Sequence, residues 1–467
     1  MVNYYALHYH MKHSGVFFVI ENVFSCLKKY SSMDLNLIYS SEKAVYENKD
    51  VKVINIPEVG YDEKTFENKE KLLERAAEIK DKIKSRLDLS EECVMHCHNI
   101  NLLKNSYLGA ALGMLAKELE EEDFTLIFQV HDFAEENRED RLNLMLNCTG
   151  KEDRKFGASI AYPLGKNILY CTINSRDKGL LEKTGIPEER ISLFPNGIDT
   201  EKLSAKPKDC KGLIEDIGKY AEANSYRFEK DRKRLAYPVK VIRRKNVIEA
   251  LLILKLLNSI KDEWQLFITL DAHSPADREY SEKVKRYVKG HGLPVVIGFG
   301  YELISPEESK DMYGMNDLFG IADAIITTSI QEGFGFTFLE GWVAGKKVIG
   351  RGIDFIFEDL EKNGLEIEHF YDNIDIDGND FADYSYDKQF ELLEKADYDA
   401  LKEQLQKMID LLYDGYNIVE HNKKKIIENY SLKAYADRLF KIIEKAKKLS
   451  YADVEIDNKE LIGYFRK

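Results

Sequence analysis

The stretch 324–350 carries two glutamates and closely spaced glycines where a strand is expected to give way to a helix. Gly333 and Gly335 precede a helix expected to begin near Thr337, so the backbone can approach a ligand and present free N–H groups to it. The partial positive charge of a helix start suits a phosphate group. Seven residues separate Glu332 from Glu340, and carboxylates accept hydrogen bonds from neighbouring hydroxyls. The glycines alone favour a simpler alternative, an ordinary glycine-rich turn with two solvated glutamates.

Composition restricts the classes of protein to which the chain can belong. Its 467 residues include 68 Lys and Arg against 82 Asp and Glu, for a net charge of −14. With 44% hydrophobic and 32% charged residues, it is too apolar for a disordered chain and too polar for a membrane bundle. No apolar run approaches the ~20 residues of a membrane span, and the first residues do not resemble a signal peptide. We therefore expect a cytoplasmic protein with reduced cysteines and without a nucleic-acid partner.

Short apolar runs alternate with helix-length segments along most of the chain. Several runs are apolar without interruption, as is typical of parallel strands buried on both faces. The alternation predicts an α/β fold of two doubly wound, Rossmann-like domains, with ligands at the carboxyl ends of the strands. The expected strands are 51–56, 93–98, 125–130, 168–173, 240–242, 265–270, 295–297, 324–328 and 347–349, and the expected helices are 64–87, 104–121, 247–257, 281–289 and 339–344.

The alternation fades between residues 205 and 234, where the sequence is polar with mixed charges and ends in a basic run. We expect a linker there, helical in part. The segment 396–448 is helical in pattern. A length of about 150 residues per domain allows two to three domains, and these patterns favour two.

Separated blocks along the chain resemble the retaining glycosyltransferases of the GT-B fold, in particular glycosyltransferase family 4. The spacing of Glu332 and Glu340 matches the E-x7-E signature of that family, and 345–350 resembles the strand that follows it. The other matches, in the order of the family, are Val130-His131-Asp132, Asn174-Ser175, Phe194 to Asp199, Lys240 to Asn246, and Tyr430-Ser431-Leu432 with its helix.

The resemblance implies roles for single residues in the binding of a nucleotide diphosphate sugar. Lys245 would contact the diphosphate, Glu332 the donor sugar and Glu340 the ribose hydroxyls. Lys240 stands where the family usually has arginine, which keeps the charge but loses the bidentate fork. Arg243 or Arg244 would supply that guanidinium; for each, a solvated face at a helix start is an equal alternative. Further donor contacts would come from the backbone N–H groups of Gly335, Phe336 and Thr337, while His131 would lie close to the transferred sugar.

The resemblance also implies that the N-terminal domain binds the acceptor. Ser14 and Gly15 resemble the glycine-rich first loop of the family, with a plain helix start as a close alternative. Asn99 and Asp132 would meet a polar acceptor, as would Arg138 and Arg141. The implied architecture has residues 1–204 as acceptor domain, 205–234 as linker and 235–429 as donor domain, facing a central cleft, while 430–467 returns to the first domain.

Two clusters could suggest a metal, and we expect neither to bind one. Cys93, His96, Cys97 and His98 lie on an expected strand, whose alternate side chains point to opposite faces, and no second pair of zinc ligands stands out. The acidic residues Asp132, Glu135, Glu136, Glu139 and Asp140 are explained by a helix start.

The implied function is metal-independent transfer of a hexosyl unit from a nucleotide diphosphate sugar to a hydroxyl of a small polar acceptor, with retention and without a cofactor. No carboxylate is evident for a covalent double displacement. The alternatives are a catalytically silent GT-B sensor or scaffold and a sugar-nucleotide epimerase of the same fold. The donor base and sugar, the acceptor and the oligomeric state are not determined by the sequence.

Overall fold

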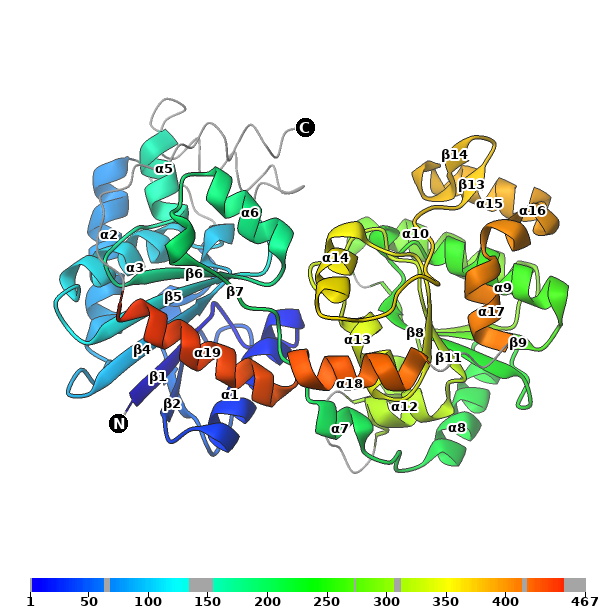
Figure 1. Cartoon of the computed structure of the whole chain (residues 1–467), viewed down its shortest axis with the longest axis horizontal. Helices are drawn as coiled ribbons and strands as arrows, with labels where there is room; N and C mark the ends of the chain where they lie inside the picture. Colours follow the sequence, from blue (N-terminus) through cyan, green and yellow to red (C-terminus); the bar gives the residue numbers. More distant parts are fainter. Residues whose placement is uncertain are drawn as a thin grey trace. The chain divides into compact units, whose positions relative to one another are not determined.

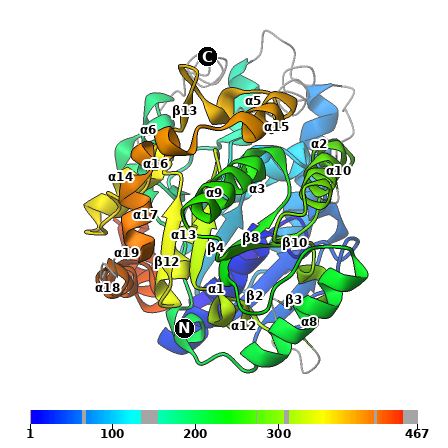
Figure 2. The ribbon, with the colours of Figure 1, turned by 90° about the vertical axis from the view of Figure 1, so that its right-hand side faces the viewer.

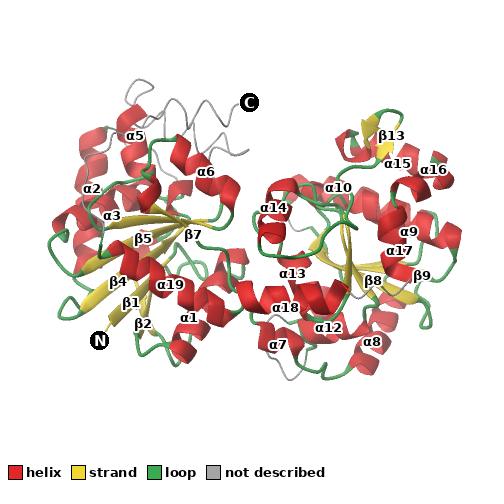
Figure 3. Ribbon diagram, in the orientation of Figure 1, coloured by secondary structure: helices red, strands yellow, loops and turns green. Residues whose placement is uncertain are grey.

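The computed structural model describes residues 2–62, 68–133, 154–272, 274–305, 312–413 and 418–448. The chain divides into two compact units. Unit 1 comprises residues 1–198 and 430–467, and unit 2 comprises 199–429. In each unit, helices cover a central sheet (Figure 3), so the predicted α/β fold class is confirmed.

Unit 1 contains a seven-stranded sheet, parallel throughout, in the order β3-β2-β1-β4-β5-β6-β7. Four of its strands match the predicted runs, and β1, β2 and β7 were not predicted. Their bounds are β1 Val2–Leu7, β2 Asp34–Tyr39, β3 Lys52–Asn55, β4 Glu92–His98, β5 Phe124–Val130, β6 Ile168–Thr172 and β7 Ile191–Leu193.

Helices α2, α3 and α5 lie on one face of this sheet, and α1 and α19 lie on the other (Figure 1). The main core fills the first of these layers, where Leu72, Leu112 and Met95 are fully buried. The helices are α1 Gly15–Tyr30, α2 Lys69–Lys84, α3 Ser106–Glu118, α5 Arg154–Ala161, α6 Ser175–Lys183 and α19 Leu432–Ala446, with short 3-10 turns η1 Pro57–Val59, η2 Ile100–Leu102 and η3 Glu188–Arg190.

The two points where the chain crosses between the units are tied together inside unit 1. The backbone N–H of Ile198 donates to Tyr430 O at 2.8 Å, and that of Leu432 donates to Ile198 O at 3.1 Å. The ring of Phe194 stacks on Tyr435 of α19 at 4.2 Å. A side chain at Gly197 would come within 2.9 Å of Tyr435. Helix α19 therefore belongs to the first unit.

Unit 2 contains a five-stranded parallel sheet in the order β10-β9-β8-β11-β12. The prediction of a strand at 240–242 was wrong, because β8 ends at Lys240. Pro238 lies within β8, where the register shifts between Tyr237 and Lys240, and an irregularity of this kind lets a strand accommodate proline. The strands are β8 Lys233–Lys240, β9 Trp264–Leu270, β10 Val295–Ile297, β11 Ala324–Thr327 and β12 Lys347–Gly350, with a separate hairpin of β13 Asp375–Ile376 and β14 Asn379–Asp380.

In Figure 2, which turns unit 2 toward the viewer, α9 lies near the centre of the view; it packs against α15 and α16. The helices of unit 2 are α7 Thr200–Ser204, α8 Cys210–Ala223, α9 Val247–Ile260, α10 Pro275–Gly290, α11 Gly300–Leu303, α12 Met315–Ile321, α13 Phe336–Val343, α14 Asp354–Lys362, α15 Tyr386–Lys395, α16 Tyr398–Gln404, α17 Gln406–Tyr413 and α18 Ile418–Tyr430, with 3-10 turns η4 Arg243–Lys245 and η5 Phe381–Asp383. In the described segments, no helix is both long and apolar enough to cross a membrane.

The segment 205–234, expected to be a linker, is instead part of unit 2. It holds α8 and the first residues of β8. Leu213, Ile217 and Ala221 form a buried stripe on α8, which packs against α12. The charged residues of α8 lie on the outer face of this amphipathic helix, which explains why the composition suggested a linker.

Candidate functional site

The centre of the candidate site in unit 2 is an ion pair between Lys245 and Glu332. Lys245 ends the turn η4 after β8, and Glu332 lies in the loop between β11 and α13. The Lys245 side chain is 12% exposed and that of Glu332 is 15% exposed, so the charges are shielded from water yet reachable. Burial lowers the pKa of Lys245, while the charge of Glu332 acts to raise it. The structure thus brings together the two residues predicted to contact the donor diphosphate and sugar.

The backbone around Lys245 is held by Tyr237 and Thr328, which the sequence analysis missed. The buried Tyr237 hydroxyl donates to Lys245 O at 2.7 Å and accepts from the backbone N–H of Thr328 at 3.0 Å. The Thr328 hydroxyl donates to Asn246 O at 3.0 Å. Asn246 has a left-handed backbone with φ 46°. These bonds fix the β8 and β11 loops to each other, and a tyrosine inside a strand gives no sequence signal for such a role.

The other basic residues near this pair have different surroundings. Arg244 is exposed, with Nη1 3.6 Å from Glu332 Oε2 and 3.2 Å from Gln331 O. The Arg243 guanidinium instead donates to Gln389 Oε1 and Tyr384 O, each at 2.6 Å. Lys240 lies exposed at the end of β8. Of the two arginines proposed for the diphosphate, only Arg244 lies beside Glu332, because Arg243 is engaged with α15 and the residues just before it.

The predicted backbone donors lie at the start of α13. Gly335 precedes the helix with φ +82°, and a Cβ there would come within 2.7 Å of Phe338. Phe336 and Thr337 are the first two residues of the helix, whose N–H groups have no acceptor within the helix. The Phe336 ring packs against Phe334 at 4.9 Å. Glycine is therefore required at 335, and the binding of a ligand by the N–H groups of this helix start remains a prediction.

Glu340 lies inside α13 and is half-buried. Burial raises the pKa of its carboxyl to about 7. Among the described residues, no side chain pairs with this carboxyl. Such a group gains from hydroxyl donors, which would replace the water that burial removes.

His131 and Asn99 form the centre of the candidate site in unit 1. His131 directly follows β5, and Asn99 follows β4 with a left-handed backbone of φ 58°. The Asn99 side-chain oxygen accepts from the backbone N–H of His131 at 2.8 Å and from that of Asp132 at 3.3 Å. Asn99 therefore shapes the loop that carries both residues, while a direct contact with the acceptor remains a prediction.

His131 packs against a buried partner, His98, which was expected on the strand 93–98 without a predicted contact to His131. His98 Nδ1 lies 3.1 Å from His131 Nε2, and their rings stack. The ring of His96 packs against that of His98 in a tilted arrangement, with the ring centres 4.3 Å apart. Burial lowers the pKa of His131 to about 4 and that of His96 to about 3. His131 is therefore neutral near pH 7, and Nδ1 is the ring nitrogen that does not face His98.

Ser14 and Gly15 form the start of α1. The Ser14 hydroxyl accepts from the backbone N–H of Phe17 at 3.2 Å, which makes it the cap of that helix. A side chain at Gly15 would meet no atom within 4 Å. Their local role is thus that of a helix start, and binding of a phosphate or acceptor here remains a prediction.

The cysteines and histidines of β4 lie on opposite faces of the strand. Cys93 and Cys97 belong to the core beneath α2 and α3, whereas His96 and His98 pack against each other on the other side. Within the described ranges, no group of three or more His, Cys, Asp or Glu side chains is arranged to hold a metal ion. Glu135, Glu136, Arg138, Glu139, Asp140 and Arg141 lie outside the described residues.

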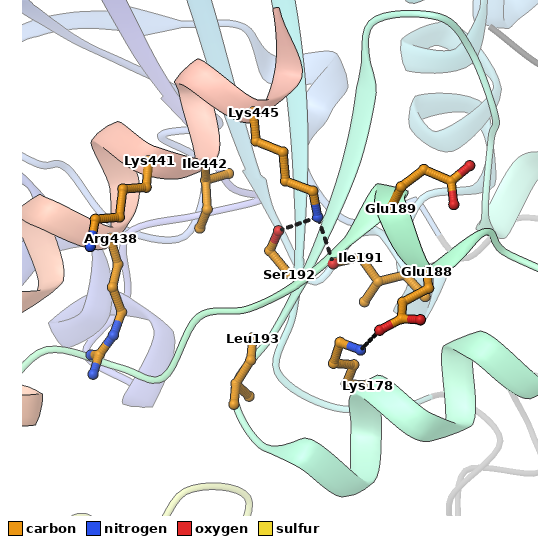
Figure 4. A pocket seen from close by; sticks show the side chains of 10 residues that line it. All are labelled: Lys178, Glu188, Glu189, Ile191, Ser192, Leu193, Arg438, Lys441, Ile442 and Lys445. Atoms are coloured by element: carbon orange, nitrogen blue, oxygen red, sulfur yellow. Dashed lines mark hydrogen bonds and ion pairs between the residues drawn. The ribbon is translucent and has the colours of Figure 1, made fainter. Parts of the chain in front are cut away.

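A separate cavity of about 660 Å³ opens on unit 1 between α6, β7 and α19 (Figure 4). Lys445 reaches from α19 to Ile191 O at 3.1 Å and to the Ser192 hydroxyl at 3.2 Å. None of the predicted site residues lines this cavity.

Comparison with known proteins relates the whole chain to sugar-transferring enzymes. Mannosylglucosyl-3-phosphoglycerate synthase of Petrotoga mobilis is 29% identical over 506 residues, covering 95% of this chain and 92% of that protein. No protein-family model matches, so assignment to glycosyltransferase family 4 remains a prediction.

Solved structures resemble the chain over nearly its full length. HepE of Anabaena, in complex with UDP and glucose, has a TM-score of 0.56 at 12% identity, covering 96% of this chain and 99% of HepE. The catalytic domain of starch synthase IV from Arabidopsis thaliana, bound to ADP and acarbose, has the same TM-score and identity, covering 95% and 99%. The chain therefore has the GT-B fold of the glycosyltransferases.

Proposed function

We propose that this protein is a glycosyltransferase that moves a sugar from a nucleotide diphosphate sugar to a hydroxyl of a small polar acceptor. The observation that carries the proposal is the shielded Lys245–Glu332 pair beside the glycine-led start of α13. The names of the relative and of the two similar structures support a nucleotide-sugar reaction. In this proposal unit 2 binds the donor and unit 1 the acceptor.

In the proposed reaction, Lys245 and Arg244 neutralise the charge that develops on the leaving diphosphate, together with the N–H groups of Phe336 and Thr337. Such prearranged electrostatic stabilisation is usually the largest catalytic contribution. Glu332 accepts hydrogen bonds from the donor sugar, which places that sugar beside the lysine. Glu340 accepts hydrogen bonds from the ribose hydroxyls. We further propose that the anomeric configuration is retained and that neither a metal nor a cofactor is needed.

Neutral His131 takes part on the acceptor side. Its Nδ1 can donate a hydrogen bond to a sugar hydroxyl when Nε2 accepts from His98, or accept one in the other tautomer. The Petrotoga relative is named for a product built on 3-phosphoglycerate. Glycosylated 3-phosphoglycerate is therefore the first acceptor to test.

The direct test is nucleotide release from UDP-, GDP- and ADP-sugars, each with and without this acceptor. We expect one donor to be turned over, in the presence of EDTA as well, and NMR of the product to show the anomeric configuration of the donor. Tight donor binding without turnover would indicate a silent sugar-nucleotide-binding protein instead. Turnover that requires added divalent metal would refute the metal-independent mechanism.

A further inference from the structure

A cluster of cationic side chains surrounds Tyr61 in unit 1. The Lys43 ammonium lies 3.6 Å from the centre of the Tyr61 ring, and that of Lys104 lies 5.6 Å from it. His10 Nε2 is 3.1 Å from the Tyr61 hydroxyl, and its ring meets the tyrosine edge-on. Both ammonium groups and the imidazole therefore converge on one half-buried aromatic ring.

The topology of the sheet brings these residues together. His10 and Lys12 follow β1, Lys43 follows β2, Tyr61 follows β3 and η1, and Lys104 follows β4 and η2. These strands are neighbours in the order β3-β2-β1-β4 and run parallel. Their carboxyl ends therefore meet at one edge of the sheet, which is where open α/β sheets bind ligands.

The segments that carry Tyr61 and Lys104 are fixed to each other through the backbone. The N–H of Asp62 donates to Lys104 O at 2.9 Å. The Asn105 side chain donates to Gly60 O at 2.7 Å and to Glu58 O at 2.8 Å. Leu103, just before Lys104, has a left-handed backbone with φ 51°, a conformation that leucine rarely adopts and that concentrates at functional sites.

Cationic side chains gather at this edge of the sheet although the protein has a net charge of −14. Burial lowers the pKa of His10, and the charges of Lys43 and Lys12 lower it further. The backbone N–H of Lys12 donates to His10 Nδ1 at 3.2 Å, which fixes the backbone of a third lysine beside the cluster. Glu42 and Asp62 lie on the same loops.

We propose that Lys12, Lys43 and Lys104 around Tyr61 form an anion subsite that binds a phosphate or carboxylate group of the acceptor. Lysine ammonium groups are compact charges suited to phosphate oxygens. The inference rests on the proposed function, and it names the residues that would recognise the anionic group of the acceptor. These residues belong to unit 1, whereas the basic residues around Lys245 belong to unit 2.

The test is calorimetric titration of the full-length protein with 3-phosphoglycerate, glycerol 3-phosphate and glycerate. The double variant Lys43→Gln/Lys104→Gln should bind 3-phosphoglycerate at least about tenfold more weakly than the unchanged protein. Lys117→Gln, an exposed lysine on α3, changes the charge equally and should leave binding unaltered. Glycerol 3-phosphate and glycerate show whether the phosphate or the carboxylate is recognised.

Binding of the donor nucleotide is measured on the same variants and should not change. The subsite is refuted if 3-phosphoglycerate does not bind the unchanged protein, or if the double variant and Lys117→Gln behave alike. Neither outcome alters donor turnover with other acceptors, so the proposed glycosyltransferase activity would survive it. Conversely, absence of donor binding would refute the proposed function. The titration with 3-phosphoglycerate would still show whether the anion subsite exists.

Discussion

Lys245 is the single residue on which the candidate donor site depends most. It has to balance both Glu332 and the charge of the leaving diphosphate from a position that is only 12% exposed. We expect Lys245→Ala to lower kcat/KM by at least about 100-fold, the usual effect of removing one prearranged stabilising group. Glu332→Ala should abolish transfer similarly. Steady-state kinetics, with circular dichroism to check folding, measures both effects.

The control for this pair is Lys261→Ala, which removes an exposed lysine of the same unit. Its activity should equal that of the unchanged protein. Near-normal transfer in folded Lys245→Ala or Glu332→Ala would mean that the site lies elsewhere.

In the proposed function, Glu340 should make donor binding sensitive to pH. Burial raises its pKa to about 7, so the folded protein holds a proton that the unfolded chain gives up near pH 4.5. This carboxyl therefore costs stability as pH rises from about 4.5 through about 7. Ribose hydroxyls stabilise the charged form, so binding at pH 7 should release up to about half a proton.

Titrations of the donor in two buffers of different ionisation enthalpy measure that release. Glu340→Gln cannot ionise, so its donor binding should release fewer protons, and its stability should fall less between pH 5 and pH 8. Equal proton release from both proteins would show that the carboxyl of Glu340 does not change its charge on binding.

At the scale of elements, a buried ionic network holds α9 against β12 and the β13–β14 hairpin. Arg351, just after β12, bonds Glu249 of α9 through Nε at 2.9 Å and Nη2 at 2.8 Å, and Asp380 at 2.7 and 2.8 Å. Glu249 also accepts from Asn246, next to Lys245, at 2.7 Å. The network therefore links α9, β12 and the β13–β14 hairpin to the loop that carries Lys245.

Arg351→Met should destabilise the protein by about 3–5 kcal/mol, because it leaves the fully buried Glu249 carboxylate without its cation. Urea unfolding followed by circular dichroism measures the change. Lys362→Met removes an exposed lysine 3.8 Å from Glu358 and should cost no more than about 1 kcal/mol. An unfolding curve unchanged by Arg351→Met would contradict a structural role for the network.

Elements whose local sequence agrees with their environment could be predicted, and the exceptions have physical causes. The apolar runs of β4, β9 and β11 suffice to identify buried strands. Most of β8 was not predicted, because it contains Pro238 and proline normally argues against a central strand. Lys245 and Glu332 were singled out by the resemblance of their motifs to a known family, whereas their pairing and the support from Tyr237, Thr328 and His98 depend on contacts between distant segments. The order of residue types along one sequence contains no information about such contacts.

At the scale of the whole molecule, the two units differ in how they should respond to acid. Unit 1 buries His8, His96, His98 and His131, and burial lowers all four pKa values, to about 3 for His8 and His96 and about 4 for His131. Among the described residues of unit 2, His369 is the only histidine whose pKa is lowered by burial, to about 4. The unit that carries the candidate acceptor site therefore holds most of the buried neutral histidines.

These histidines should make unit 1 unfold first as the pH falls. Below about pH 6.5 these histidines bind protons in the unfolded chain but not in the folded unit. Stability is therefore lost between about pH 6.5 and pH 4. Each neutral histidine costs up to about 1.4 kcal/mol per pH unit in this range. Hydrogen exchange followed by mass spectrometry at pH 7 and pH 5, corrected for intrinsic rates, compares the units in one molecule. Peptides from β4 and β5 should lose more protection than those from β9 and β11, and equal losses would show that the buried stack does not control acid stability.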